Sequence, residues 1–234
     1  MRVALISDAH GNAVGLRAAL DDIGRRGADL VVALGDMAQG GPQPVECLAL
    51  LRDVEAQVVL GNADAFLLDP DASTEPSTER MLTQRDWSLA QLAPADLDYI
   101  RSFEATVEIA LDGLELLCFH ATPADYDSVV RPEDPPDPFE GTGADLLAGG
   151  HVHVPQLRRV GEAWYVNPGS VGLGYDARQP DDDFRFDAWA SYAIVEAGSV
   201  EFHRVPFDLD ELDRVTQAAG MPLAGEVFER YRRS

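Results

Sequence analysis

Seven side chains that can ligate a metal ion share one feature of the sequence: each stands at, or a few residues beyond, the end of a short apolar run. These side chains are Asp8, His10, Asp36, Asn62, His120, His151 and His153. The apolar runs cover residues 3–6, 30–34, 58–60, 114–119 and 146–148. In open α/β sheets, ligands bind at the edge formed by the carboxyl ends of the strands. We therefore expect the seven side chains to converge at such an edge.

The seven donors are imidazole nitrogens and oxygens, with no thiolate among them. This mixture suits Mn, Fe, Co or Zn, with manganese the favoured candidate, and argues against a structural cysteine–zinc site or an all-oxygen calcium site. Seven donors are too many for one tetrahedral ion. They suit two ions that share a carboxylate and lie about 3.5–4 Å apart, as in two-metal hydrolases. The pattern thus predicts two divalent transition-metal ions.

Each motif has a plainer interpretation when it is taken alone. Gly35-Asp36 and Gly61-Asn62 are common turn dipeptides, and a lone His120 is more often a hydrogen-bonded core histidine than a ligand. The pair His151 and His153 is a stronger signal, because side chains at i and i+2 of an extended segment face the same side. The recurrence of all five motifs at predicted strand ends favours the metal site.

Predicted strands and helices alternate in the first quarter of the chain, and they position the first four of these residues. Residues 3–6, 30–34 and 58–60 are short continuous apolar runs, typical of buried parallel strands. Apolar residues at 16, 19, 20 and 23 follow helical spacing, and Pro44 suits the first turn of a second helix. This order predicts a right-handed βαβαβ unit.

The remainder of the chain is predicted to be a helical stretch, then strands, then terminal helices. We expect helices at about 64–103, strands near 107–109, 114–119, 146–148, 156–160, 164–166, 190–195 and 200–205, and helices over 208–233. Asp112-Gly113 between two apolar runs is a hairpin signal. We expect a single domain over residues 1–234, with acidic loops at about 122–143 and 175–187.

Charge is the unusual feature of the composition. The chain has 18 basic and 41 acidic residues, a formal net charge of −23, and all 18 basic residues are arginine. So negative a surface repels nucleic-acid backbones and anionic lipid, so we expect neither as a partner. The absence of lysine excludes Schiff-base and Walker-type lysine chemistry. The composition leaves homo-oligomerisation open.

Nothing in the sequence indicates secretion or a disulfide framework. Cys47 and Cys118 lie far apart in apolar surroundings, as small buried side chains do. The chain opens directly on an apolar run, without the pattern of a signal peptide, and contains no stretch long enough to span a bilayer. We therefore expect a cytoplasmic protein.

The ordered motifs resemble the five blocks of the calcineurin-like metallophosphoesterases. These motifs are Asp8-x-His10, Gly35-Asp36, Gly61-Asn62, His120 and Gly150-His151-x-His153. The run Asn167-Pro168-Gly169-Ser170 and the chain length are similar to the small prokaryotic phosphodiesterase branch. The resemblance covers residues 1 to about 205. It implies an α/β/β/α sandwich of two mixed sheets, with a dinuclear metal centre at the carboxyl ends of the strands.

The resemblance also implies a role for each ligand. Asp8, His10 and His153 would hold the first ion, Asn62, His120 and His151 the second, and Asp36 would bridge them. A hydroxide between the ions would attack phosphorus in a small phosphate ester, most favourably a diester. A metal-dependent hydrolase of another substrate, such as an amide, would use the same ligands.

The third block departs from the family pattern. It reads Gly61-Asn62-Ala63-Asp64, with Ala63 where the family usually has a histidine that assists the leaving group. General acid catalysis typically accelerates a reaction roughly 10²–10⁴-fold. Without it, the rate of hydrolysis should fall most for esters with basic leaving groups. Asp64 is a candidate substitute acid, although orienting a ligand is the favoured role. The loss also motivates an alternative function, a catalytically weak or inactive scaffold for protein interaction.

The sequence indicates the residues that contact the substrate less clearly than it indicates the metal ligands. Arg131 and Arg178, in the two acidic loops, are candidate phosphate partners, with ion pairs to neighbouring acids as the alternative. Asn12 is positioned either to cap the first helix or to face a phosphate. Tyr126 and Tyr175 are candidates to line the pocket. The run of acids at 181–183 is expected to be solvated rather than to bind calcium.

Overall fold

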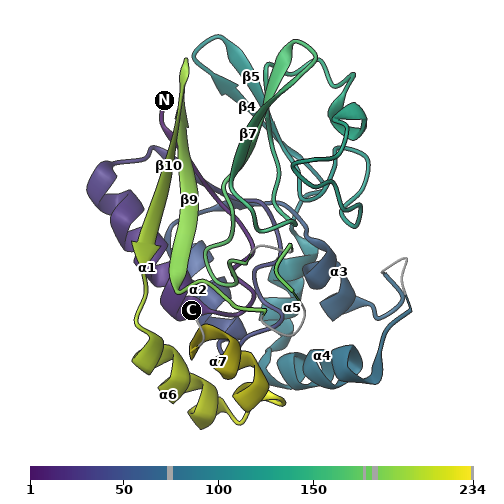
Figure 1. The fold of residues 1–234 in the computed structure, drawn as a ribbon, viewed down its shortest axis with the longest axis vertical. Coiled ribbons are helices and arrows are strands. Elements are labelled where there is room, and N and C mark those ends of the chain that lie inside the picture. Colours follow the sequence, from purple (N-terminus) through teal and green to yellow (C-terminus); the bar gives the residue numbers. More distant parts are fainter. Residues whose placement is uncertain (73–75, 176–177, 181–183, 233–234) are drawn as a thin grey trace.

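Short apolar runs form the first sheet. The computed structural model of the protein describes residues 1–72, 76–175, 178–180 and 184–232 (Figure 1). The strands of this sheet are β1 (Val3–Ile6), β2 (Leu30–Ala33), β3 (Gln57–Val58), β9 (Trp189–Glu196) and β10 (Ser199–Pro206). Their order is β10-β9-β1-β2-β3. β1, β2 and β3 are parallel, and β9 runs antiparallel to β1. The predicted parallel unit is confirmed.

The second sheet is built from the middle of the chain. Its strands are β4 (Val107–Leu111), β5 (Leu114–Cys118), β6 (Leu146–Ala148), β7 (Gln156–Val160) and β8 (Ala163–Asn167). Their order is β4-β5-β6-β8-β7. The predicted hairpin joins β4 and β5, where Asp112 and Gly113 both have positive φ, 51° and 92°. Two central residues with positive φ are what a two-residue type I′ turn requires.

The two sheets face each other across one apolar layer. Val3, Leu5 and Val32 of the first sheet belong to this layer together with Leu116 and Val166 of the second. All five side chains are almost completely buried. Because strand side chains alternate between faces, the neighbouring residues of β1 point to the opposite face of the first sheet. Each sheet therefore has an inner and an outer core.

Helix α1 (Ala13–Arg26) packs on the outer face of the first sheet, and residues of the other helices extend the same apolar core. The other helices are α2 (Pro44–Asp53), α3 (Asn62–Leu68), α4 (Glu79–Gln91), α5 (Pro94–Arg101), α6 (Leu209–Ala219) and α7 (Ala224–Arg232). The last two lie at the foot of Figure 1, with α7 between α6 and α4. Arg80 of α4 and Glu226 of α7 form an ion pair of 2.6 Å. The helices expected at 64–103 and after residue 208 are confirmed. Within the described ranges, every helix is too short or too polar to span a bilayer.

A loop segment, rather than an α-helix, covers the outer face of the second sheet. Val130 and Phe139 of the predicted loop at 122–143 are buried against Tyr165 and Leu147. Residues Asp137–Phe139 form one turn of 3₁₀ helix, and the ring of Phe139 stacks on Tyr165 at 4.3 Å between centroids. The mixed α/β class with two mixed sheets is confirmed, and the layer over the second sheet is mostly irregular chain.

Candidate metal centre

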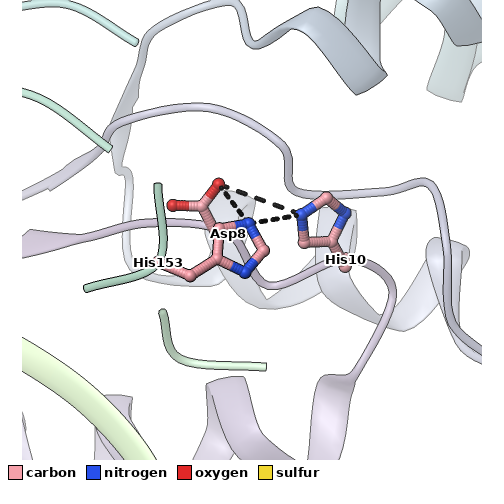
Figure 2. A group of neighbouring side chains, drawn as sticks. All are labelled: Asp8, His10 and His153. Carbon is pink, nitrogen blue, oxygen red and sulfur yellow. Dashed lines mark hydrogen bonds and ion pairs between the residues drawn. The ribbon is translucent and has the colours of Figure 1, made fainter. Parts of the chain in front are cut away.

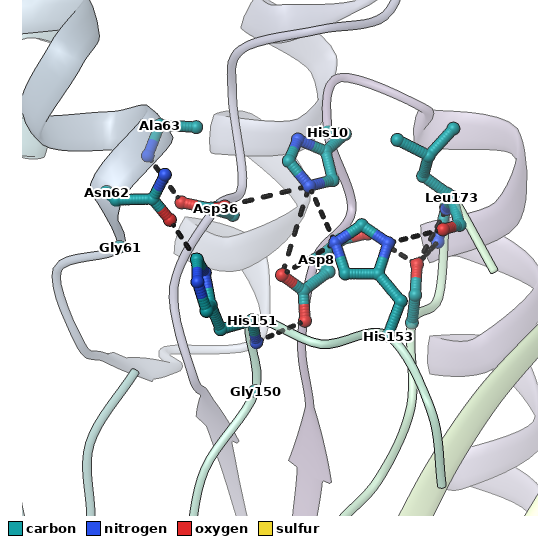
Figure 3. Close-up of polar contacts among 12 residues, drawn as sticks. Asp8, His10, Asp36, Gly61, Asn62, Ala63, Gly150, His151, His153 and Leu173 are labelled. Atoms are coloured by element: carbon teal, nitrogen blue, oxygen red, sulfur yellow. Dashed lines mark hydrogen bonds and ion pairs between the residues drawn. The ribbon is translucent and has the colours of Figure 1, made fainter. Parts of the chain in front are cut away.

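All seven predicted ligands lie in loops, or at a helix start, directly after strands. Asp8 and His10 follow β1, Asp36 follows β2, and Asn62 is the first residue of α3, after β3. His120 follows β5, and the pair at 151 and 153 follows β6. The two sheets thus contribute from their carboxyl ends, and the side chains meet in one cluster, most of which is visible in Figure 3.

Asp8, His10 and His153 form a first group (Figure 2). The Nε2 atom of His153 lies 3.3 Å from Oδ1 of Asp8 and 3.2 Å from Nε2 of His10. Nε2 of His10 lies 3.9 Å from the same carboxylate oxygen. Two ring nitrogens and one carboxylate oxygen therefore point at a common position, which is how three ligands of one cation are arranged.

Asp36, His120 and His151 form a second group. The amide oxygen of Asn62 lies 3.0 Å from Nε2 of His120 and 3.0 Å from Nδ1 of His151. Oδ2 of Asp36 lies 3.4 Å from Nε2 of His120 and 3.6 Å from Nε2 of His10. One oxygen of Asp36 thus lies between the two groups, where a bridging carboxylate would have to be.

Hydrogen bonds on the far side of three rings orient them toward the cluster. The Nδ1 atom of His10 lies 3.0 Å from the carbonyl of Gln39, and that of His120 lies 2.6 Å from the carbonyl of Leu34. His153 makes the same contact at 2.5 Å with the carbonyl of Leu173. Because a carbonyl accepts only from N–H, each ring carries a proton on Nδ1 and turns its Nε2 atom inward.

The backbone at the ligands is strained. Asp8, His10, Asp36, His151 and His153 have φ of 56°, 46°, 58°, 70° and 59°. Left-handed conformations cost of order 1–3 kcal/mol for residues other than glycine and cluster at functional sites. Backbone bonds between the first two loops hold the strain, from Asp8 N to Gly35 O at 3.0 Å and from His10 N to Asp36 O at 2.9 Å.

Two glycines allow the loops to approach each other closely. A Cβ atom on Gly61 would collide with Oδ1 and the backbone nitrogen of Asp36. A Cβ atom on Gly150 would collide with the hydroxyl of Ser7, next to Asp8. Gly61 and Gly150, each next to a predicted ligand, are therefore required for packing of the cluster.

Asp64 supports the loop that carries Asp36. Its carboxylate accepts hydrogen bonds from the backbone nitrogens of Asp36 at 2.7 Å, Met37 at 3.0 Å and Ala38 at 3.3 Å. The side chain is completely buried. Burial, followed by the negative charge of Asp36, raises the pKa of Asp64 to about 7. These contacts favour the orienting role over the role of leaving-group acid.

Burial and charge act in opposite directions on the ligands. Burial favours a neutral Asp36, but the charge of His120 and His10 outweighs it, so the pKa of Asp36 falls well below its usual range. Burial alone would lower the pKa of His120, whereas the carboxylate of Asp36 raises it to about 9. At neutral pH without a cation, His120 is protonated and paired with Asp36. A divalent cation at this site would replace that proton.

One polar segment was not identified as functional from the sequence. Ser170 donates from Oγ to the carbonyl of Asp8 at 2.8 Å and accepts from the nitrogen of Leu173 at 2.7 Å. Asn167 donates to the carbonyl of Gly150 at 2.6 Å. These side chains hold the backbone of both ligand groups from behind. The only sign of these contacts in the sequence is the run Asn167-Pro168-Gly169-Ser170, which indicates a family resemblance and not a supporting role for its side chains.

The proposed substrate contacts do not all lie at the cluster. Asn12 caps α1 by accepting from the nitrogen of Gly15 at 2.9 Å, and it donates to the carbonyl of Gly172 at 2.9 Å. Its amide is thus used on both sides and buried, so the capping interpretation is confirmed. Tyr126 donates to the carbonyl of Ala72 at 3.4 Å.

Two cavities flank the cluster. Tyr126 lines a cavity of about 650 Å³ together with His120 and Thr122. Arg131 and Arg178 line another of about 200 Å³ together with His151 and Tyr175. The two predicted arginines, which are 47 positions apart in the chain, thus lie in one cavity beside the ligands. The acidic run at 181–183 lies outside the described residues.

The sequence profile of the calcineurin-like phosphoesterase superfamily domain matches residues 1–197. An uncharacterised protein of Methanocaldococcus jannaschii is 28% identical over 226 residues, which cover 88% of each chain.

Two solved structures extend the likeness over nearly the whole chain. One is a metallophosphoesterase from Sphaerobacter thermophilus, with a TM-score of 0.79 and 27% identity, covering 98% of this chain and 97% of that one. The other, a hypothetical protein of Pyrococcus horikoshii, has a TM-score of 0.81 and 19% identity, covering 97% and 96%. The second likeness concerns the fold alone.

Proposed function

The chain belongs to the calcineurin-like phosphoesterase superfamily, and from this premise we propose that it hydrolyses small phosphate esters, most favourably diesters, with two divalent transition-metal ions. The observation that carries the proposal is the position of Asp36. Its Oδ2 atom lies within 3.6 Å of ring nitrogens from both ligand groups. Two-metal phosphoryl hydrolysis depends on such a shared ligand.

The residues of the cluster suit the proposed ions. Oδ1 of Asp8 is buried and has no hydrogen-bond partner among the described residues, although it is a strong acceptor. The rings of His10 and His153 turn their Nε2 atoms toward each other at 3.2 Å, an arrangement that a shared proton or a cation between them would stabilise. Imidazole and carboxylate donors suit Mn, Fe, Co and Zn, and manganese is our first candidate.

Asp8, His10 and His153 would hold one ion, and Asn62, His120 and His151 the other, with Asp36 between them. When bound, the ions would supply a water of lowered pKa as the nucleophile and positive charge for the phosphoryl oxygens. The chain's own residues fix this arrangement. The carbonyls of Gln39, Leu34 and Leu173 set the tautomers of three histidines, and Asp64 holds the backbone at Asp36.

Ala63 bears on the kind of ester. Its backbone nitrogen donates to Oδ1 of Asp36 at 2.7 Å, as Figure 3 shows, and its methyl group has no proton to give to a departing alcohol. Asp64, the nearest acid in the sequence, is engaged with backbone nitrogens. Esters whose leaving groups need no protonation should therefore react best. We propose diesters with weakly basic leaving groups as the preferred artificial substrates.

The experiment is hydrolysis of bis(p-nitrophenyl) phosphate by metal-stripped protein reconstituted with Mn²⁺, Fe²⁺, Co²⁺ or Zn²⁺. We expect turnover that requires added metal and saturates near two ions per chain. The absence of turnover with every metal, across neutral and alkaline pH, would overturn the proposal. The missing histidine at position 63 would then favour the second candidate function, a scaffold for protein interaction that keeps the fold.

A further inference from the structure

A cavity of about 200 Å³ opens beside His151, outside the ligand set. Its lining includes two arginines, one acid and several apolar or aromatic residues, among them Arg131, Arg178, Glu133, Tyr175, Val152 and Val154. We call it the arginine cavity. It combines cationic groups with apolar walls, which is the composition of a small-molecule site rather than of a random surface depression.

The charge of the arginine cavity is opposite to that of the protein. The chain carries a net charge of −23, and nine of its arginines form ion pairs with carboxylates among the described residues. Over the same residues, the side chain of Arg131 forms no ion pair, although Glu133 lines the same cavity and further acidic residues surround Arg131 in the sequence. An arginine whose guanidinium group forms no ion pair is available to an anionic ligand.

Tyr175 joins the arginine cavity to the metal centre. Its ring lies 4.6 Å from the ring of His153, between centroids, and it also lines the cavity. Burial, and then the charges of Asp8 and Asp36, raise the pKa of Tyr175, while Arg131 acts in the opposite sense. Its hydroxyl makes no hydrogen bond within the described part of the chain. A ligand in the cavity would therefore lie next to a phosphoryl group held at the cluster.

The size of the arginine cavity limits what it can hold. Sites for drug-sized ligands usually measure about 300–1,000 Å³, so about 200 Å³ suits one anionic group on a short carbon chain. The cavity at His120 and Thr122, of about 650 Å³, is large enough for a bulkier substituent. The two sides of the centre thus differ in both size and charge.

We infer that the arginine cavity binds a second phosphoryl group of the substrate, through Arg131 and Arg178. The substrates would then be small phosphodiesters in which one alcohol carries a further phosphate. This inference rests on the proposed function and names its substrate class. Tetrahedral phosphate and two guanidinium groups match in charge, and each arginine can donate two parallel hydrogen bonds.

Two p-nitrophenyl phosphodiesters test this inference, one with 2-phosphonoethanol and the other with n-propanol as the second alcohol. They share the leaving group and differ in the terminal anion. Charged hydrogen bonds contribute about 1.5–3 kcal/mol each, so wild-type kcat/KM should favour the phosphonoethyl ester by about 10- to 100-fold. Arg131→Gln and Arg178→Gln should each lower this ratio about 10-fold.

Arg159→Gln is the matched control, because Arg159 is also exposed but binds the carbonyl of Gly161 at the far end of β7. This variant should keep the wild-type ratio, which separates local contacts from the change in net charge. A wild-type ratio near one, or an equal ratio in all three variants and the wild type, would overturn the inference.

Calorimetry with 2-hydroxyethylphosphonate, which is the second alcohol of the first ester, provides a readout without turnover. Metal-free wild-type protein and Arg159→Gln should bind it, and Arg131→Gln should bind it about 10-fold more weakly. Lack of hydrolysis of the n-propyl ester would count against the proposed function alone. Lack of calorimetric binding to a protein that hydrolyses the n-propyl ester would count against the arginine cavity alone.

Discussion

Asp36→Asn tests whether one carboxylate serves both ligand groups. Oδ1 of Asp36 accepts from the nitrogen of Ala63 at 2.7 Å, while Oδ2 faces His120 and His10 at 3.4 and 3.6 Å. An asparagine must place its NH₂ group in one of these two positions. There it would face either the N–H of Ala63 or the space between the ligand groups. In both orientations the negative charge is lost.

The size of the effect follows from these contacts. Removing a group that only supports a metal ligand costs about 10–100-fold in metal affinity. The loss of Asp36, a direct ligand in our proposal, should cost at least about 100-fold for each ion, or about 2.8 kcal/mol. At metal concentrations below both dissociation constants, the doubly loaded population should then fall by about 10⁴-fold, and activity with it.

The assay combines metal analysis, titration calorimetry and hydrolysis of bis(p-nitrophenyl) phosphate. Asp98→Asn is the matched control, since it removes the same charge from a side chain that is 76% exposed on α5. We expect wild-type metal content for the control and less than two ions per chain for Asp36→Asn. If Asp36→Asn bound two ions with unchanged affinity and kept full turnover, our reasoning about the bridge would be refuted.

Three further predictions concern the leaving group, the metal and the helix α1. Ala63→His should raise monoester hydrolysis relative to diester hydrolysis, measured against Ala63→Gln as the control; an unchanged ratio would show that the leaving group is protonated from elsewhere. Chelation should lower the melting temperature in calorimetry, because a ligand at 100 times its Kd stabilises the native state by about 2.7 kcal/mol; no shift after verified metal removal would contradict this. Asp22 accepts from the hydroxyl of Tyr192 at 2.6 Å and from Arg26 at 2.7 Å, and these bonds lower its pKa to about 2. Because the folded pKa lies below the unfolded value near 4, the stabilisation is present above pH 4 and is lost as the pH falls toward 2. Asp22→Asn should therefore reduce the free energy of unfolding by about 1 kcal/mol at pH 7 and by less below pH 4, measured with urea; a pH-independent difference would argue against this account.

Strands such as β1, β2 and β6 were predictable because their residues are short apolar runs followed by turn residues. The run at 3–6 became β1, and Asp112-Gly113 became the hairpin turn between β4 and β5. These outcomes depend on local preferences, which act within a few residues. The covering of the second sheet was not predictable in the same way, because Phe139 lies in a proline-rich segment with no periodic pattern.

The candidate ligands were also predictable, since polar residues at strand ends need only the strands to be identified. Their supports were not. Ser170 touches the backbone of Asp8 across 162 positions of sequence, and no local pattern in the chain indicates that contact. The same holds for Asp64, whose carboxylate accepts a hydrogen bond from the backbone of Asp36, 28 positions earlier in the chain.

By itself, the sequence determined which side chains stand at the strand ends and which elements lead to them, because apolar periodicity and turn chemistry are local. Only the tertiary structure decided which nitrogen of each ring faces inward, that one oxygen of Asp36 lies between two ligand groups, and that Arg131 and Arg178 share a cavity. Those distances arise when two sheets, formed from distant parts of the chain, bury their apolar faces against each other. Contact between residues so far apart in sequence depends on how the layers fit together, and local composition does not encode it.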